Sequence, residues 1–103
     1  TEGMNDLQTP PDRAEALAAA GGLPLIAPAA HLSTAHTLSN NAFDSAPAFL
    51  NRRADNGEWV TAGLVQFPDN DHFAIFRNPD AAALYQEFLQ SALEGGTPLI
   101  TEQ

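Results

Sequence analysis

Asp6 and His72 are the two residues of this chain that combine most readily into a catalytic unit. A carboxylate that accepts a hydrogen bond from one imidazole nitrogen fixes the tautomer of the ring and stabilises the cation that forms during reaction. The second ring nitrogen then serves as a general base toward a hydroxyl group. Each residue lies in a turn that follows an extended segment and precedes a predicted helix. We therefore expect the two side chains to meet and to share one proton.

Residues 1–30 are predicted to form the turn that carries Asp6 and then a helix. The opening residues have no period and are interpreted as the exit from a strand. Thr9 can cap the helix, Pro10 suits its first position, and a glycine pair marks its end. Two prolines interrupt the apolar run at residues 23–30, which predicts an edge strand or an extended connection.

Residues 59–103 are predicted to form a last strand, the turn that carries His72 and a closing helix. The apolar run at residues 59–67 is typical of a buried strand. An Asn-Pro-Asp sequence begins a helix over residues 79–93, in which apolar side chains recur every three or four positions. Because strands alternate with helices, the sequence predicts a parallel sheet whose chemistry lies at the carboxyl ends of its strands.

Residues 31–58 have no clean helical or strand period and are predicted to form a long irregular excursion. The Asp-Asn-Gly sequence at residues 55–57 favours a hairpin or tight turn before the last strand. Structureless loops of this length are uncommon unless they bind or cover something. Phe43, Phe49 and Leu50 either line an acyl pocket or pack on the sheet.

The two ends of the chain resemble the last part of an α/β-hydrolase. Glu-Gly-Met-Asn-Asp at residues 2–6, followed by Thr-Pro-Pro, is similar to the turn after the seventh strand, where the acid of the family lies. Leu-Val-Gln-Phe-Pro-Asp-Asn-Asp-His-Phe at residues 64–73 resembles the eighth strand and its histidine turn. The helix from Pro79 is similar to the closing helix. The resemblance implies that Asp6 is the acid and His72 the general base of an esterase- or lipase-like serine hydrolase.

The resemblance implies an α/β fold in which residues 1–103 form one C-terminal segment, with the last two strands, flanking helices and a long intervening excursion. The interval between acid and histidine is longer than is usual in the family, and residues 31–58 account for the excess. No Gly-x-Ser-x-Gly nucleophile elbow is present, since the serines lack such flanking glycines. This chain alone is therefore expected to be inactive.

The partner that the resemblance implies is an N-terminal portion of the same hydrolase, which carries the nucleophilic serine and the oxyanion hole. Together they would hydrolyse a small-molecule or lipid ester. The alternative is a non-catalytic binding or structural module that keeps a hydrolase-like architecture.

The amino-acid composition excludes several classes of structure and function. The 103 residues leave room for one domain, and the absence of cysteine excludes disulfides and thiolate chemistry. A net charge of -9 with 4 basic residues argues against nucleic-acid binding, and no apolar run is long enough for a membrane span. We expect no cofactor. The sequence does not fix a location, and a secreted or periplasmic one is compatible with the family.

Plainer structural roles compete with the catalytic ones. Asp6 can form an Asx-turn or cap the following helix, and His72 can be a surface histidine in a turn. Glu2 is a substitute acid, although it would lie inside the strand. His31 and His36 are five residues apart and would not share a helix face, so they are interpreted as loop residues rather than metal ligands. The acidic turn at 69–71 lacks the glycine and glutamate of a calcium loop, and we expect no metal there.

Overall fold

Two short strands from opposite parts of the chain form the centre of the fold. In the computed structural model, β1 (Glu2–Gly3) pairs in parallel with β6 (Gln66–Phe67). The N–H of Glu2 donates to the carbonyl of Val65 at 2.8 Å, and the N–H of Met4 donates to that of Phe67 at 3.0 Å. The structure describes residues 1–8, 10–31, 34–38, 43–71 and 73–102.

The described residues form a mixed α/β globule with small two-stranded sheets and four helices. In chain order the elements are β1 (Glu2–Gly3), α1 (Pro11–Ala20), β2 (Leu25–Ala27), α2 (Thr34–Thr37), β3 (Phe43–Ser45), β4 (Arg52–Arg53), β5 (Trp59–Val60), β6 (Gln66–Phe67), α3 (Ala74–Arg77) and α4 (Pro79–Gly95). None of the helices in this part of the chain combines the length and the apolar character needed to span a bilayer.

The parallel pairing that the sequence predicts is confirmed, but β2 is not the edge strand that was expected. β2 pairs in parallel with β3, and a parallel bridge between Leu25 and Leu64 joins β2 to the segment that leads into β6. Strand β2 therefore lies between two neighbours, and the predicted edge position is wrong. Both prolines flank β2 instead of interrupting it, and the carbonyl of Pro24 accepts from the N–H of Leu64 at 2.8 Å.

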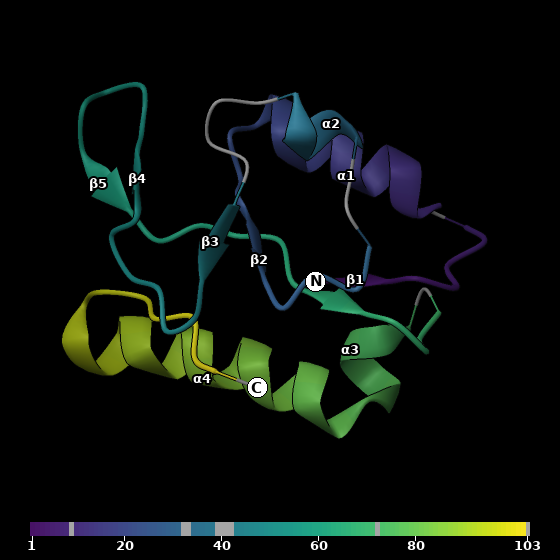
Figure 1. Cartoon of the computed structure of the whole chain (residues 1–103). Helices are drawn as coiled ribbons and strands as arrows, with labels where there is room; N and C mark the ends of the chain where they lie inside the picture. Colours follow the sequence, from purple (N-terminus) through teal and green to yellow (C-terminus); the bar gives the residue numbers. More distant parts are fainter. Residues whose placement is uncertain (9, 32–33, 39–42, 72, 103) are drawn as a thin grey trace.

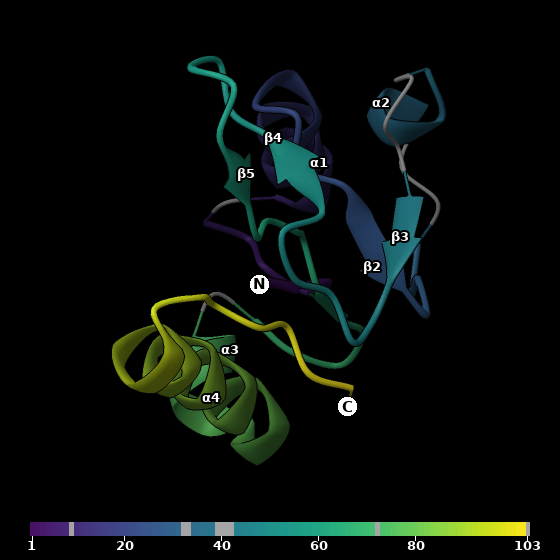
Figure 2. The ribbon, with the colours of Figure 1, turned by 90° about the vertical axis from the view of Figure 1, so that its left-hand side faces the viewer.

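Helices cover both faces of these strands. Val65 and Phe67 pack with Ala81 and Leu84 of α4, whereas Leu64 packs on the other face with Ala18 of α1. This alternation follows from the two-residue period of extended chain. Figure 1 shows the resulting layers, with α1 and α2 on one side of the strands and α3 and α4 on the other, and the rotated view in Figure 2 agrees.

The closing helix begins as its sequence predicts. The side chain of Asn78 accepts hydrogen bonds from the N–H groups of Asp80 and Ala81, which caps α4. Its end lies at Gly96, which adopts a left-handed conformation with φ 73°. The apolar stripe is only partly covered, since Tyr85 and Leu89 remain 45% and 48% exposed.

The first helix, α1, starts one residue later than predicted. Helix α1 begins at Pro11, with Pro10 in the N-cap position, and the predicted cap Thr9 lies outside the described residues.

The single buried strand predicted for residues 59–67 is wrong. Trp59 and Val60 form β5, which pairs antiparallel with β4 in an exposed hairpin, and only the last residues of the run reach β6. The hairpin predicted from residues 55–57 is confirmed, because Gly57 has φ 87° and the N–H of Ala54 donates to the carbonyl of Glu58 at 2.7 Å. Trp59 stays at the surface, 5.3 Å from the Arg53 guanidinium. The stretch at 31–58 is also less irregular than expected, since it contains α2, β3 and β4.

We expect Gly3→Ala to destabilise the fold by about 3 kcal/mol, because a Cβ at this position would overlap backbone atoms that cannot rotate away. It would lie 2.5 Å from the carbonyl oxygen of Asn70 and would also overlap that of Asp71. Chemical denaturation of the native protein measures the change. Gly95→Ala is the matched control, since a Cβ there meets nothing within 4 Å. Equal stability of the two variants would contradict the close approach.

Candidate functional site

The turns that follow β1 and β6 lie against each other. The N–H of Asn5 donates to the carbonyl of Asn70 at 2.8 Å, and the missing side chain of Gly3 allows the backbone of residues 70–71 to approach. Both turns leave the carboxyl ends of a parallel pair, on the same side of the molecule (Figure 1). The turn that carries Asp6 therefore lies beside residues 68–71, while the expected meeting of the Asp6 and His72 side chains stays a prediction.

Asp6 is half-buried and its carboxyl group shapes its own turn. The N–H of Gln8 donates to Oδ1 of Asp6 at 2.8 Å, and the N–H of Asp6 donates to the carbonyl of Gly3 at 3.1 Å. This is the Asx-turn that was the structural alternative for Asp6. The bond from Gln8 also fixes the orientation of the carboxyl group, which a role as a triad acid requires.

His72 lies outside the described residues, so its contact with Asp6 stays a prediction. The residues on either side of it are well anchored. Asp71 accepts the N–H of Phe73 on Oδ1 at 2.9 Å and the Arg77 guanidinium on Oδ2 at 3.2 Å. Arg77 also lies 4.9 Å from the centre of the Phe73 ring. Asp71 thus joins the end of the second turn to Phe73 and to Arg77 of α3.

A second polar cluster lies between α1 and the strands, in which Glu2, Glu15 and Gln66 are buried and His31 is exposed. Gln66 donates through Nε2 to Oε1 of Glu2 at 2.7 Å and to Oε1 of Glu15 at 3.1 Å. Its Oε1 accepts the N–H of His31 at 2.9 Å. Nδ1 of His31 in turn lies 3.0 Å from Oε1 of Glu15. One buried amide therefore ties together β1, β6, α1 and the segment after β2.

The surroundings of this cluster raise the pKa values of two of its side chains, Glu2 and His31. Burial, reinforced by the nearby Glu15 carboxylate and opposed by the Gln66 amide, raises the pKa of Glu2 from 4.5 to about 7. The hydrogen bond and the negative charge of Glu15 raise the pKa of His31. Glu2 and His31 therefore hold their protons to higher pH than exposed Glu and His side chains do.

Sequence reasoning missed this cluster. Glu2 does lie in a strand, as expected, but Glu15 was interpreted only as an acid suited to the helix dipole and His31 as a loop residue. His36 is not a loop residue, since it lies in α2, fully buried, with Nε2 2.9 Å from the carbonyl of Leu23. A usable signal existed, because the 3.6-residue period of α1 places Glu15 on the same face as Ala18.

An apolar groove of about 300 Å³ lies between α4 and the segment before β6. Its walls include Ala62, Gly63 and Val65 on one side and Leu84 and Phe88 on the other. The groove is distinct from both polar sites, since Asp6 and the Glu2 cluster do not line it.

Comparison of the chain with known proteins gives no relative from which a functional role can be transferred. No family model, no curated protein and no solved structure matches the chain.

We expect the Glu2 carboxyl group to titrate near pH 7 in the folded protein, which ¹³C NMR of glutamate side chains can measure. Because its folded pKa is raised above 4.5, Glu2 contributes stability that is present below about pH 4.5 and is lost as the pH rises toward 7. His31, whose pKa is also raised, acts in the same direction as it loses its proton.

Glu2→Gln should remove the titration and flatten the dependence of stability on pH between 4.5 and 7. Exposed Glu94→Gln is the control and should change neither. A Glu2 signal that titrates near 4.5, or an unchanged pH dependence in Glu2→Gln, would contradict the assignment.

Proposed function

We propose that this chain is the C-terminal portion of an α/β-hydrolase of the esterase or lipase type, in which Asp6 orients His72 and His72 acts as general base. The observation that carries the proposal is the hydrogen bond between Asn5 and Asn70, at 2.8 Å, which joins the two turns at the carboxyl ends of parallel strands. In parallel α/β sheets this is the edge where catalytic side chains gather.

We prefer Asp6 to Asp71 as the acid of His72 because the Arg77 guanidinium already pairs with the Asp71 carboxylate. Each of the two carboxyl groups also accepts an N–H of its own turn, Asp71 from Phe73 and Asp6 from Gln8. Asp6 lies on the adjacent strand end, where a carboxylate can accept the imidazole N–H and stabilise the cation.

The reaction needs a serine nucleophile and an oxyanion hole from an N-terminal portion of the hydrolase. His72 would accept the serine proton while the hydroxyl attacks the ester carbonyl, and would then return it to the leaving alcohol. Helices on both faces of a parallel pair support this architecture, and so does the open apolar groove beside α4, which suits packing against further chain.

The test uses the protein purified from its native source, so that any portion linked to this chain is retained. We expect a fluorophosphonate to label a serine outside residues 1–103, and acyl esters to be hydrolysed. His72→Ala and Asp6→Asn should each lower kcat by at least about 10³-fold, with little change in KM, because a triad acts in the transition state.

Exposed Asp69→Asn, in the same turn, is the matched control and should retain kcat within about threefold. A native protein that takes up no fluorophosphonate and hydrolyses no ester overturns the proposal in favour of the non-catalytic binding module. Full turnover in His72→Ala overturns it as well.

A further inference from the structure

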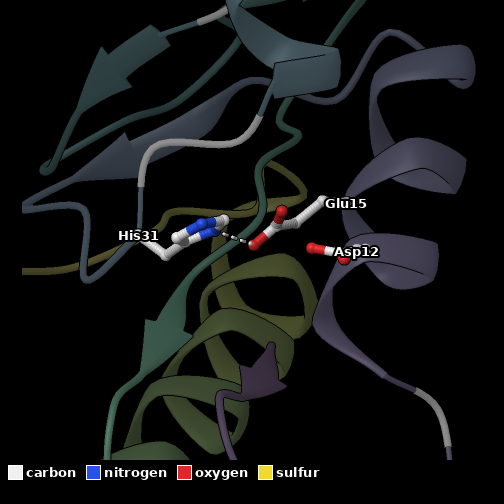
Figure 3. A group of neighbouring side chains, drawn as sticks. All are labelled: Asp12, Glu15 and His31. Atoms are coloured by element: carbon white, nitrogen blue, oxygen red, sulfur yellow. Dashed lines mark hydrogen bonds and ion pairs between the residues drawn. The ribbon is translucent and has the colours of Figure 1, made fainter.

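Three side chains at the outer end of the buried cluster have the chemistry and the placement of metal ligands. Asp12 and Glu15 lie three residues apart on one face of α1, and His31 reaches them from the segment after β2 (Figure 3). One ligand atom from each residue lies within 4.8 Å of the other two. The 3.0 Å between Nδ1 of His31 and Oε1 of Glu15 matches two ligands about 2.1 Å from one ion at a right angle.

A second observation comes from Glu2, which is only 6% exposed. Its Oε1 is held by Gln66, the residue that also holds Glu15, whereas its Oε2 is buried with no hydrogen-bond partner among the described residues. A buried carboxylate oxygen without a partner is costly. A cation held by Glu15 would place positive charge close to this buried carboxyl group.

The excess of negative charge at these residues and their access to solvent also favour the binding of a cation. Two carboxyl groups, those of Asp12 and Glu15, lie beside the imidazole of His31, which forms an ion pair with Glu15. The site is also open to solvent at one end, because Asp12 is exposed and the His31 side chain is 49% exposed. An ion can therefore enter from outside and meet the buried Glu15 carboxyl group.

We propose that Asp12, Glu15 and His31 bind a divalent transition-metal ion of the Zn²⁺ type, with the buried carboxyl group of Glu2 behind Glu15, where Gln66 orients both groups. An imidazole together with carboxylates suits Zn²⁺ better than Ca²⁺ or Mg²⁺, which prefer oxygen ligands alone. Gln66 is a positioning residue, since its amide orients the two buried carboxyl groups and its carbonyl holds the backbone of His31. This proposal does not depend on the hydrolase proposal.

The experiment titrates Zn²⁺ into the chelator-stripped native protein by calorimetry, with Ca²⁺ and Mg²⁺ as competitors. We expect one Zn²⁺ per chain at this site, with a change in the ¹⁵N shift of His31 Nδ1 on binding. His31→Gln and Asp12→Asn alter exposed side chains, so the fold should survive, and each should weaken binding by about 10–100-fold. Glu2→Gln should weaken it by at least about tenfold while leaving the ligands of the outer end in place.

Glu94→Gln is the matched control, because it removes an exposed carboxylate of α4 and should leave Zn²⁺ affinity unchanged. Circular dichroism of each variant separates loss of a ligand from loss of the fold. Absence of Zn²⁺ binding overturns the proposal. Equal affinity in the native protein and in folded His31→Gln or Asp12→Asn overturns it too, since the ion would then lie elsewhere.

Discussion

The parallel pairing of β1 with β6 is the contact on which both candidate sites depend. Only two residues of each strand pair, yet the pairing brings Glu2 beside Gln66 at one end and the Asp6 turn beside residues 68–71 at the other. The close approach requires glycine at position 3, because the carbonyls of the second turn occupy the space of a side chain. The pairing of two strands that lie more than 60 residues apart in the sequence therefore requires a residue without a Cβ atom at position 3.

The polar cluster on α1 opposes the usual pattern of an amphipathic helix. Glu15 faces the strands and is 2% exposed, whereas Leu17 on the outer face is 76% exposed. Burying a carboxylate costs free energy unless hydrogen bonds or opposite charge compensate. Gln66 and His31 supply part of that compensation. Such a departure from the local rule is more typical of a site than of a core.

Local signals in the sequence predicted local structure well. The helix start at Asn78 and the hairpin at residues 55–57 each depend on residues within a few positions of one another, and both are confirmed. The error at Trp59 has a different cause. Its apolar character is typical of a buried strand, but stacking against Arg53 and pairing with β4 keep it at the surface, and only the tertiary arrangement decides this.

The same limit explains why one candidate site was predicted in outline and the other was missed. Parallel strands bring their carboxyl ends together, so the turns after residues 3 and 67 were predictable neighbours once both strands were identified. The partners of Glu15 lie 16 residues away at His31 and 51 residues away at Gln66, and no local pattern links them. Glu2 and Gln66 are the first residues of β1 and β6, whereas Asp6 follows β1. The metal proposal and the hydrolase proposal therefore concern opposite ends of the β1–β6 pair, and each can fail without the other.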